Sequence, residues 1–149
     1  LLFTPGTYGG GTSLPAITND EPNNALPLSV LNFIPTDFCE LYTTNGATAS
    51  ANIATCSAAT AGTPDDDVWF RFSLAQAKNL NITLRSSGAF DGVLQVFSDA
   101  GTTPIICVNA TLDGLSENIT NQQFSAGNYY IRVYHAGVGS FNTNGTGYF

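Results

Sequence analysis

A run of three carboxylates leads directly into an alternating apolar stretch, and this feature constrains the fold most. The stretch reads Thr63-Pro64-Asp65-Asp66-Asp67-Val68-Trp69-Phe70-Arg71-Phe72. Neighbouring like charges repel one another, so such a run is unfavourable near a strand unless a cation or solvent relieves it. Val68, Phe70 and Phe72 fall on one face and the residues between them on the other, which is the pattern of a half-buried strand. The stretch therefore predicts an acidic loop followed by a core strand.

Further apolar runs recur along the chain, most of them separated by turns that contain glycine. The predicted strands are Leu26–Leu31, Val68–Leu74, Leu80–Leu84, Val93–Phe97, Ile105–Val108, Ile119–Phe124 and Tyr129–Tyr134. Because short strands recur and no segment has a convincing helical period, we predict an all-β fold. The expected architecture is an antiparallel β-sandwich of the jelly-roll type, which a strand from a neighbouring subunit could complete. The core side chains expected from the alternation are Val68, Phe70, Phe72, Ile82, Leu84, Ile131 and Val133.

The chain divides into an arm and one domain. Near its start lie the flexible triple glycine Gly9–Gly11 and two prolines, Pro5 and Pro15, which disfavour regular structure. We therefore expect a flexible N-terminal arm, residues 1–18, and a β-sandwich domain, residues 19–149. The chain's 149 residues suit a single hydrophobic core. No signal peptide is evident, so we expect a mature form or a fragment.

The charge composition narrows the classes of partner. Only 4 residues are Lys or Arg, 10% of the chain is charged, and the net charge is −7. Without a cationic patch we expect no binding to nucleic acid or to anionic membranes. No apolar run approaches the roughly 20 residues of a transmembrane helix, so we expect no membrane insertion. The abundance of hydroxyl and amide side chains is common in secreted proteins, and we predict an extracellular location at the cell surface.

Three cysteines, Cys39, Cys56 and Cys107, have spacings that fit no CxxC metal-binding pattern. Cys39 and Cys56 bracket a segment rich in Thr, Ala, Asn and Gly. We predict a disulfide that closes this loop, with two buried thiols as the alternative. Cys107 follows two isoleucines in an apolar strand and is expected to be a buried free thiol.

Several segments, taken together, resemble one family of bacterial domains. The segments are NDEPNNALPL, GATAS, DDDVWFRF, FDGVLQVFS and AGNYYIRVY, with the bracketing cysteines. Over residues 19–149 they resemble the bacterial pre-peptidase C-terminal domain, in the variant common in secreted, cell-surface proteins of the Bacteroidetes. This resemblance implies a non-catalytic accessory β-sandwich, of the kind found on secreted peptidases, glycosidases and adhesins.

The chain departs from this family in two places. Many relatives carry a cysteine just before the Ile-Cys strand that is absent here, which supports an unpaired Cys107. The family usually continues with a further apolar strand after its Gly-x-Gly-Tyr-Phe-like segment, whereas this sequence stops at Phe149. We therefore expect an open sheet edge beside the last residues.

The resemblance also implies a calcium site. In relatives, an acidic linker and an acidic loop before a strand share Ca²⁺. The matching residues in this sequence are Glu21, Asn23, Asn24, Asp65, Asp66 and Asp67. Ca²⁺ takes six to eight oxygen ligands, which such side chains and loop carbonyls can supply. The alternative is a solvated turn at Asp65–Asp67, with Asn19 and Asp20 capping local backbone.

Catalysis finds little support in the sequence, and we predict that the chain is not an enzyme. The single histidine, His135, follows a strand and is accompanied by no GxSxG, HExxH or nucleophile–base pattern. We expect a surface histidine. Asp91 and Asp113 precede glycines, and turn geometry accounts for both.

Three aromatic residues are candidates for contact with a ligand or partner. Trp69, Tyr130 and Tyr134 lie on the strand faces opposite to the expected core residues. Flat rings on an exposed sheet face suit stacking on sugars. The alternative is that extra strands or a neighbouring subunit cover this face.

Four Asn-x-Ser/Thr sequons begin at Asn81, Asn109, Asn118 and Asn144. They are possible glycosylation sites, although a chain this rich in Asn, Ser and Thr contains such triplets by chance.

These observations favour an extracellular structural or adhesive module, with assembly into a cell-surface filament as the specific hypothesis. The apolar start of the arm, Leu1, Leu2 and Phe3, could add a strand to another copy and so form a homopolymer. The alternative is an accessory domain of a secreted hydrolase that binds surface glycans or proteins.

Overall fold

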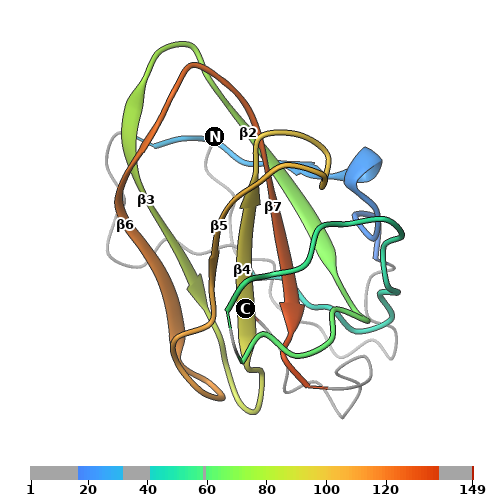
Figure 1. The fold of residues 1–149 in the computed structure, drawn as a ribbon. Helices are drawn as coiled ribbons and strands as arrows, with labels where there is room; N and C mark the ends of the chain where they lie inside the picture. Colours follow the sequence, from blue (N-terminus) through green and yellow to red (C-terminus); the bar gives the residue numbers. More distant parts are fainter. Residues whose placement is uncertain (1–16, 32–40, 59, 138–148) are drawn as a thin grey trace, which may run out of the picture.

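The computed structural model describes residues 17–31, 41–58, 60–137 and 149 (Figure 1). A single turn of 3-10 helix, η1 (Pro22–Asn24), precedes the strands. The strands are β1 (Leu26–Pro27), β2 (Val68–Leu74), β3 (Lys78–Arg85), β4 (Gly92–Phe97), β5 (Pro104–Val108), β6 (Ser116–Phe124) and β7 (Gly127–His135). The prediction of an all-β chain is confirmed.

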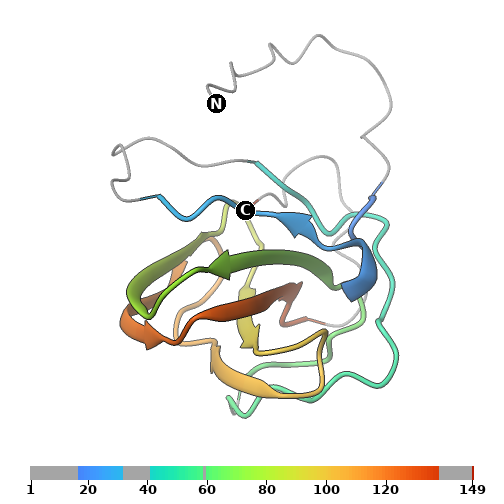
Figure 2. The ribbon, with the colours of Figure 1, turned by 90° about the horizontal axis from the view of Figure 1, so that it is seen from above.

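Two sheets make up the sandwich. The larger sheet has the strand order β1-β2-β7-β4-β5, and the smaller one pairs β3 with β6 (Figures 1 and 2). Apart from β1, which runs parallel to β2, neighbouring strands are antiparallel. This confirms the predicted antiparallel sandwich. The face of the five-stranded sheet that points toward β3 and β6 is called the core face here, because the main hydrophobic core lies against it.

Aromatic side chains fill much of this core. Phe72 of β2 packs against Phe124 of β6 and Tyr129 of β7, with ring centroids 5.8 and 5.1 Å away. Phe149 is 9% exposed and lies near Phe70, with ring centroids 6.2 Å apart. Such contacts between rings stabilise a core beyond the area that they bury.

The expected core residues are confirmed. Val68, Phe70, Phe72, Leu84, Ile131 and Val133 are buried, and Ile82 is partly buried against the same cluster. The residues of β2 and β3 expected to face the core are the ones packed in it, so the predicted strand phase is right; Trp69 is also buried, on the opposite face of β2.

Strand bounds agree with the prediction for β2 and differ by one to three residues at the ends of the later strands. The first strand is the exception. Only Leu26–Pro27 forms β1, in place of the expected Leu26–Leu31, and Leu28 adds one further hydrogen bond from its N–H to the carbonyl of Arg71. Pro27 has no N–H to donate, which limits ladder formation and confines such a strand to a sheet edge.

A segment without regular structure lies against the other face of the five-stranded sheet. We call residues 50–58 the covering segment and this face the covered face; the segment crosses β4 and β7 in the view of Figure 1. Its side chains Ile53 and Ala54 pack near Trp69 and Phe97, and Cys56 and Ala58 pack near Val93 and Tyr134. The sheet is therefore buried on both faces along its centre.

Candidate functional site

A row of side chains crosses the covered face of the sheet. The register places Trp69 of β2 opposite Arg132 of β7, Arg132 opposite Gln95 of β4, and Gln95 opposite Cys107 of β5. Residues directly opposite one another in a sheet share a face. These four side chains therefore form one line across the strands, which we call the polar row.

Arg132 lies at the centre of the polar row with only 2% of its side chain exposed. Its Nε donates a hydrogen bond to Oδ2 of Asp67 at 2.6 Å. The guanidinium carbon lies 5.6 Å from the ring centroid of Trp69 and 5.2 Å from that of Tyr134. A buried cation needs such partners, because desolvation of an unpaired charge is expensive.

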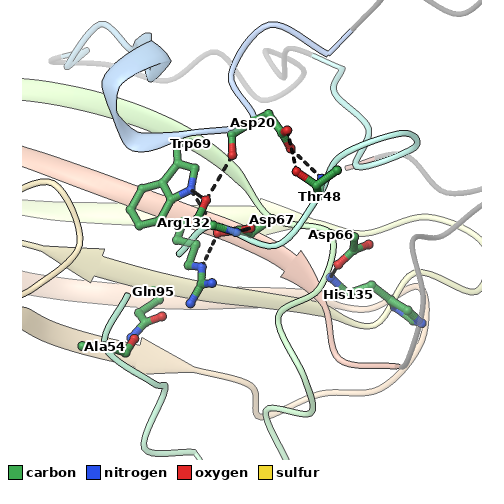
Figure 3. A network of polar contacts seen from close by, with 10 residues as sticks. Asp20, Thr48, Ala54, Asp66, Asp67, Trp69, Gln95, Arg132 and His135 are labelled. Carbon is green, nitrogen blue, oxygen red and sulfur yellow. Dashed lines mark hydrogen bonds and ion pairs between the residues drawn. The ribbon is translucent and has the colours of Figure 1, made fainter. Parts of the chain in front are cut away.

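The Asp67 carboxylate gathers further donors around this ion pair (Figure 3). Its Oδ2 also accepts a hydrogen bond from Nε1 of Trp69 at 3.0 Å, and its Oδ1 accepts one from the backbone N–H of Ser50 at 2.8 Å. Both oxygens are thus used inside the protein. Asp67 fixes Arg132 and Trp69 relative to each other and holds the start of the covering segment against β2.

The covering segment is attached to the polar row at three successive points. Ser50 Oγ accepts a hydrogen bond from Trp69 Nε1 at 2.9 Å, and the Ala54 carbonyl accepts one from Gln95 Nε2 at 3.1 Å. Cys56 forms a disulfide with Cys107, with a Cα–Cα distance of 5.6 Å. The segment therefore runs across the sheet, from β2 over β4 to β5.

This disulfide corrects the cysteine prediction. Cys56 pairs with Cys107, so the predicted Cys39–Cys56 bond and the free thiol at Cys107 are both wrong. Cys39 lies outside the described residues. Proximity in sequence favoured a short loop, but the packing of the covering segment on edge strand β5 decides the partner.

The carboxylates of the acidic loop, Asp65–Asp67, have different surroundings in the structure. Asp66 is fully buried, and its two oxygens accept hydrogen bonds from Thr44 Oγ1 at 2.7 Å and from the backbone N–H of His135 at 3.1 Å. Asp67 binds Arg132 instead, and Asp65 is partly buried. The repulsion expected within the triplet is therefore relieved by protein donors at Asp66 and Asp67.

Calcium binding by the predicted ligand set stays a prediction. Glu21, Asn23 and Asn24 are exposed at η1, whereas Asp66 and Asp67 are buried beside β2 and β7. In the described part of the chain, no three His, Cys, Asp or Glu side chains group in a way that could hold a metal ion. The observed geometry fits hydrogen bonding of these buried carboxylates to protein donors.

Two residues just before η1 hold the N-terminal linker in place, and they do not merely cap local backbone. Asp20 accepts hydrogen bonds at its two carboxylate oxygens from the backbone N–H and the hydroxyl of Thr48, at 2.6 and 2.8 Å. Asn19 donates from Nδ2 to the Trp69 carbonyl at 3.0 Å, and its own carbonyl accepts from the Trp69 N–H. Residues 19 and 20 are thereby fixed to β2 and to the residues that lead into the covering segment.

The proposed exposed aromatic face is not present. Trp69 is 0% exposed and Tyr134 is 1% exposed, because the covering segment and its neighbours lie on them, while Tyr130 is partly buried. Burial raises the pKa of Tyr134 to about 12, with the nearby carboxylates adding to this effect and Arg132 opposing it. The prediction that these rings point away from the core face is right, but that second face is also interior.

His135 and Asp91 meet at the end of β7. His135 Nδ1 accepts a hydrogen bond from the backbone N–H of Asp91 at 3.1 Å, and the imidazole packs on Phe90 with centroids 5.6 Å apart. Burial, and then the carboxylates of Asp113 and Glu117, raise the pKa of Asp91, whereas His135 lowers it. The predicted surface histidine is instead half-buried, with one ring nitrogen engaged by backbone.

The sequons differ in their surroundings. Asn81 and Asn118 are exposed on β3 and β6. Asn109 is 8% exposed, and the Nδ2 that would carry a glycan donates to the Thr60 carbonyl at 2.7 Å. Asn144, like the arm residues 1–3, lies outside the described residues.

Arg132 and Gln95 occupy the centre of the candidate site but are not among the site residues predicted from the sequence. The signal was available, because each is a polar residue within an otherwise apolar strand, in YYIRVY and VLQVF. Polar groups in such strands are retained where they find hydrogen-bond partners. The charge of Asp67 marks it as a candidate in the sequence, but its partner Arg132 lies 65 residues away.

Comparison with known proteins gives one family. The family model of the bacterial pre-peptidase C-terminal domain matches residues 66–135, a range that begins at Asp66 and ends at His135, the last residue of β7. No curated protein and no solved structure matches the chain. Residues 66–135, which contain β2 to β7, are thus similar to a small, non-catalytic β-sandwich domain typical of secreted bacterial proteins.

Proposed function

We propose that this chain is a non-catalytic extracellular module with a structural or adhesive role. The observation that carries the proposal is the family match over residues 66–135, because that domain is a non-catalytic accessory unit of secreted bacterial proteins. The disulfide between Cys56 and Cys107 is compatible with an oxidising, extracellular environment. No described residue belongs to a helix that is long and apolar enough to cross a membrane.

The use of charged groups supports the same proposal. Arg132, Asp66, Asp67 and Glu117 are at most 2% exposed, and each is held by hydrogen bonds inside the protein. In these positions they fix strands and loops relative to one another. A site for chemistry on a substrate needs such groups within reach of a ligand, so their burial favours a structural role.

As the specific form of this role we propose a filament subunit that assembles by strand addition. Edge strand β5 supports it: within the described residues β5 pairs only with β4, and its Ile105 is 41% exposed. Unpaired edges with apolar side chains accept an extended segment of another chain. The arm residues Leu1, Leu2 and Phe3 would supply that segment in a homopolymer.

The acceptor edge proposed here differs from the one expected beside the final residues. Phe149 exchanges two backbone hydrogen bonds with Tyr42 of the same chain, at 2.9 and 3.1 Å. The backbone N–H and C=O of Phe149 are therefore already paired with Tyr42 and are not open to an added strand on that side. Strand β5 is the edge that fits addition of a further strand better.

Deletion of residues 1–8 tests the filament hypothesis. We expect the intact chain to form polymers that are visible by negative-stain microscopy, and the deleted chain to sediment as a monomer. The double variant Leu2→Ser, Phe3→Ser should behave like the deletion, whereas Thr4→Ser should still polymerise. A monomeric intact chain, or a deleted chain that polymerises, would contradict the hypothesis and leave the accessory-module role.

A second candidate function is binding of neutral glycans as an accessory domain of a secreted hydrolase. It is favoured by the exposed face of β3 and β6, where Asn79 Nδ2 donates to Asn121 Oδ1 and Thr83 Oγ1 donates to Asn118 Oδ1. Uncharged amide and hydroxyl groups of this kind suit sugar hydroxyls.

Calorimetric titration with neutral oligosaccharides tests this second candidate. Thr83→Val keeps the side-chain shape and removes the hydroxyl, so it should weaken binding. Ser57→Ala, on the exposed surface of the covering segment, is the control and should bind as the parent does. Equal binding by both variants would exclude the β3–β6 face.

A further inference from the structure

Two buried polar atoms at the centre of the polar row lack a partner within the described residues. They are Nη1 of Arg132 and Oε1 of Gln95. The two residues are 2% and 0% exposed and stand directly opposite each other on β7 and β4. Their side chains lie on the same covered face, and Figure 3 shows the carboxamide and the guanidinium end turned toward one another.

The surroundings fix which atoms face this point. Gln95 donates from Nε2 to the Ala54 carbonyl at 3.1 Å, so the amide orientation follows from its hydrogen bond and places Oε1 on the other side. Arg132 is held at Nε by Asp67 and lies near the rings of Trp69 and Tyr134. Neither side chain can turn away without losing these contacts.

The two atoms define the chemistry of whatever lies between them. Nη1 is a donor on a cation, and Oε1 is an acceptor, so a bridging group must both accept and donate a hydrogen bond. The amide oxygen disfavours an anion, and the guanidinium disfavours a metal cation. A neutral hydroxyl-type molecule satisfies both atoms, and burial beneath Ala54 restricts its size.

We propose that a single enclosed water molecule binds between Nη1 of Arg132 and Oε1 of Gln95. Buried waters typically serve polar groups that the protein leaves unsatisfied. This water links β7 to β4, and through Gln95 it links both strands to the covering segment at Ala54. It completes the solvation of the buried cation, a role independent of the assembly or glycan binding proposed above.

Two measurements on the intact protein test the proposal. An atomic-resolution crystal structure should show one water within hydrogen-bond distance of both Nη1 and Oε1. In solution, the guanidinium protons of Arg132 should show nuclear Overhauser cross-peaks to a long-lived water. A direct hydrogen bond between the two side chains, an ion at this point, or ordered side chains without intervening density would each overturn the proposal.

Variants at position 95 distinguish a specific loss of the bound water from a general loss of stability. Gln95→Met removes the acceptor at similar length, and the water cross-peak should disappear. Gln95→Leu also removes the acceptor, with a shorter side chain, and should abolish the cross-peak in the same way. The exposed Gln123→Met on β6 is the control and should leave the cross-peak unchanged.

The pattern across these variants decides the outcome. A cross-peak that survives in Gln95→Met means that Gln95 does not hold the water, and the proposal is wrong. If Gln95→Met does not fold, Gln95→Leu decides, because a cross-peak that survives in a folded variant without the acceptor contradicts the bridge.

Discussion

At the scale of single residues, the buried pair of Arg132 and Asp67 is the interaction whose disruption should lower the stability of the fold most. Its geometry is favourable, at 2.6 Å and with side-chain exposures of 2% and 0%. Replacing a buried pair by apolar residues is often tolerated, whereas removing one member leaves a charge without its partner. The two kinds of change should therefore differ sharply.

The first prediction follows from this asymmetry. Arg132→Met should lower the free energy of unfolding by about 3–5 kcal/mol, because the Asp67 carboxylate stays buried without its cation. The double variant Arg132→Met, Asp67→Leu should recover part of that loss in urea unfolding. Arg85→Met, on the exposed side of β3, is the control and should change stability by no more than ~0.5 kcal/mol. An equally small effect at Arg132 would show that the pair contributes little.

The second prediction concerns Tyr134 in alkali. Its pKa in the folded protein is raised from 10.0 to about 12 by burial, so folding favours the protonated phenol. The associated stability is fully present below pH 10 and is lost as the pH rises from 10 toward 12. The midpoint of urea unfolding should fall across this window in the parent and fall less in Tyr134→Phe. The same decline in both proteins would assign the alkaline transition to other groups.

At the scale of secondary-structure elements, alternation predicted the strands because burial alone dictates it. Val68, Phe70 and Phe72 face one core, and their period of two required no knowledge of distant partners. The covering segment has no such period. Ser50 and Ala54 reach the sheet through hydrogen bonds and Cys56 through the disulfide, so their positions depend on Trp69, Gln95 and Cys107. Contacts of this range cannot be read from local pattern.

The third prediction tests the disulfide that fixes this segment. Loss of a crosslink across 51 residues should lower stability by about 4 kcal/mol in the chain-entropy model. Cys56→Ser should therefore unfold at much lower urea concentration, and the fluorescence of the single tryptophan, Trp69, should shift to the red if the segment lifts. Cys39→Ser is the matched control, expected to keep the crosslink. A free thiol count that rises by one in Cys39→Ser would contradict the pairing.

The fourth prediction belongs to the acidic loop. If Asp65–Asp67 and Glu21 share Ca²⁺, the metal binds only the folded protein, and excess EDTA should lower the melting temperature. Added Ca²⁺ should restore it, while Mg²⁺ at the same concentration serves as the comparison. An unchanged melting curve would leave Asp66 and Asp67 with the protein donors seen in the structure.

At the scale of the whole molecule, the family match and the fold do not coincide. The match begins at Asp66, so the covering segment, η1 and β1 lie outside it. These parts nevertheless bury Trp69 and hold the edge of β2. The two-sheet architecture was predictable from strand patterns, while burial of the second face was not, since it depends on a segment with no regular structure. The expected exposed face of aromatic rings is absent because this segment and its neighbours bury it.

The Cys56–Cys107 disulfide also sets how the chain responds to pulling. If the chain is pulled at its two ends, force passes along its backbone, and the bond bypasses the 51-residue interval that contains β2, β3 and β4. At about 3.4 Å per residue, those residues would add roughly 170 Å of length if they could unravel. In the oxidised chain the tension passes through sulfur instead, so this part of the sandwich acts as an inextensible link.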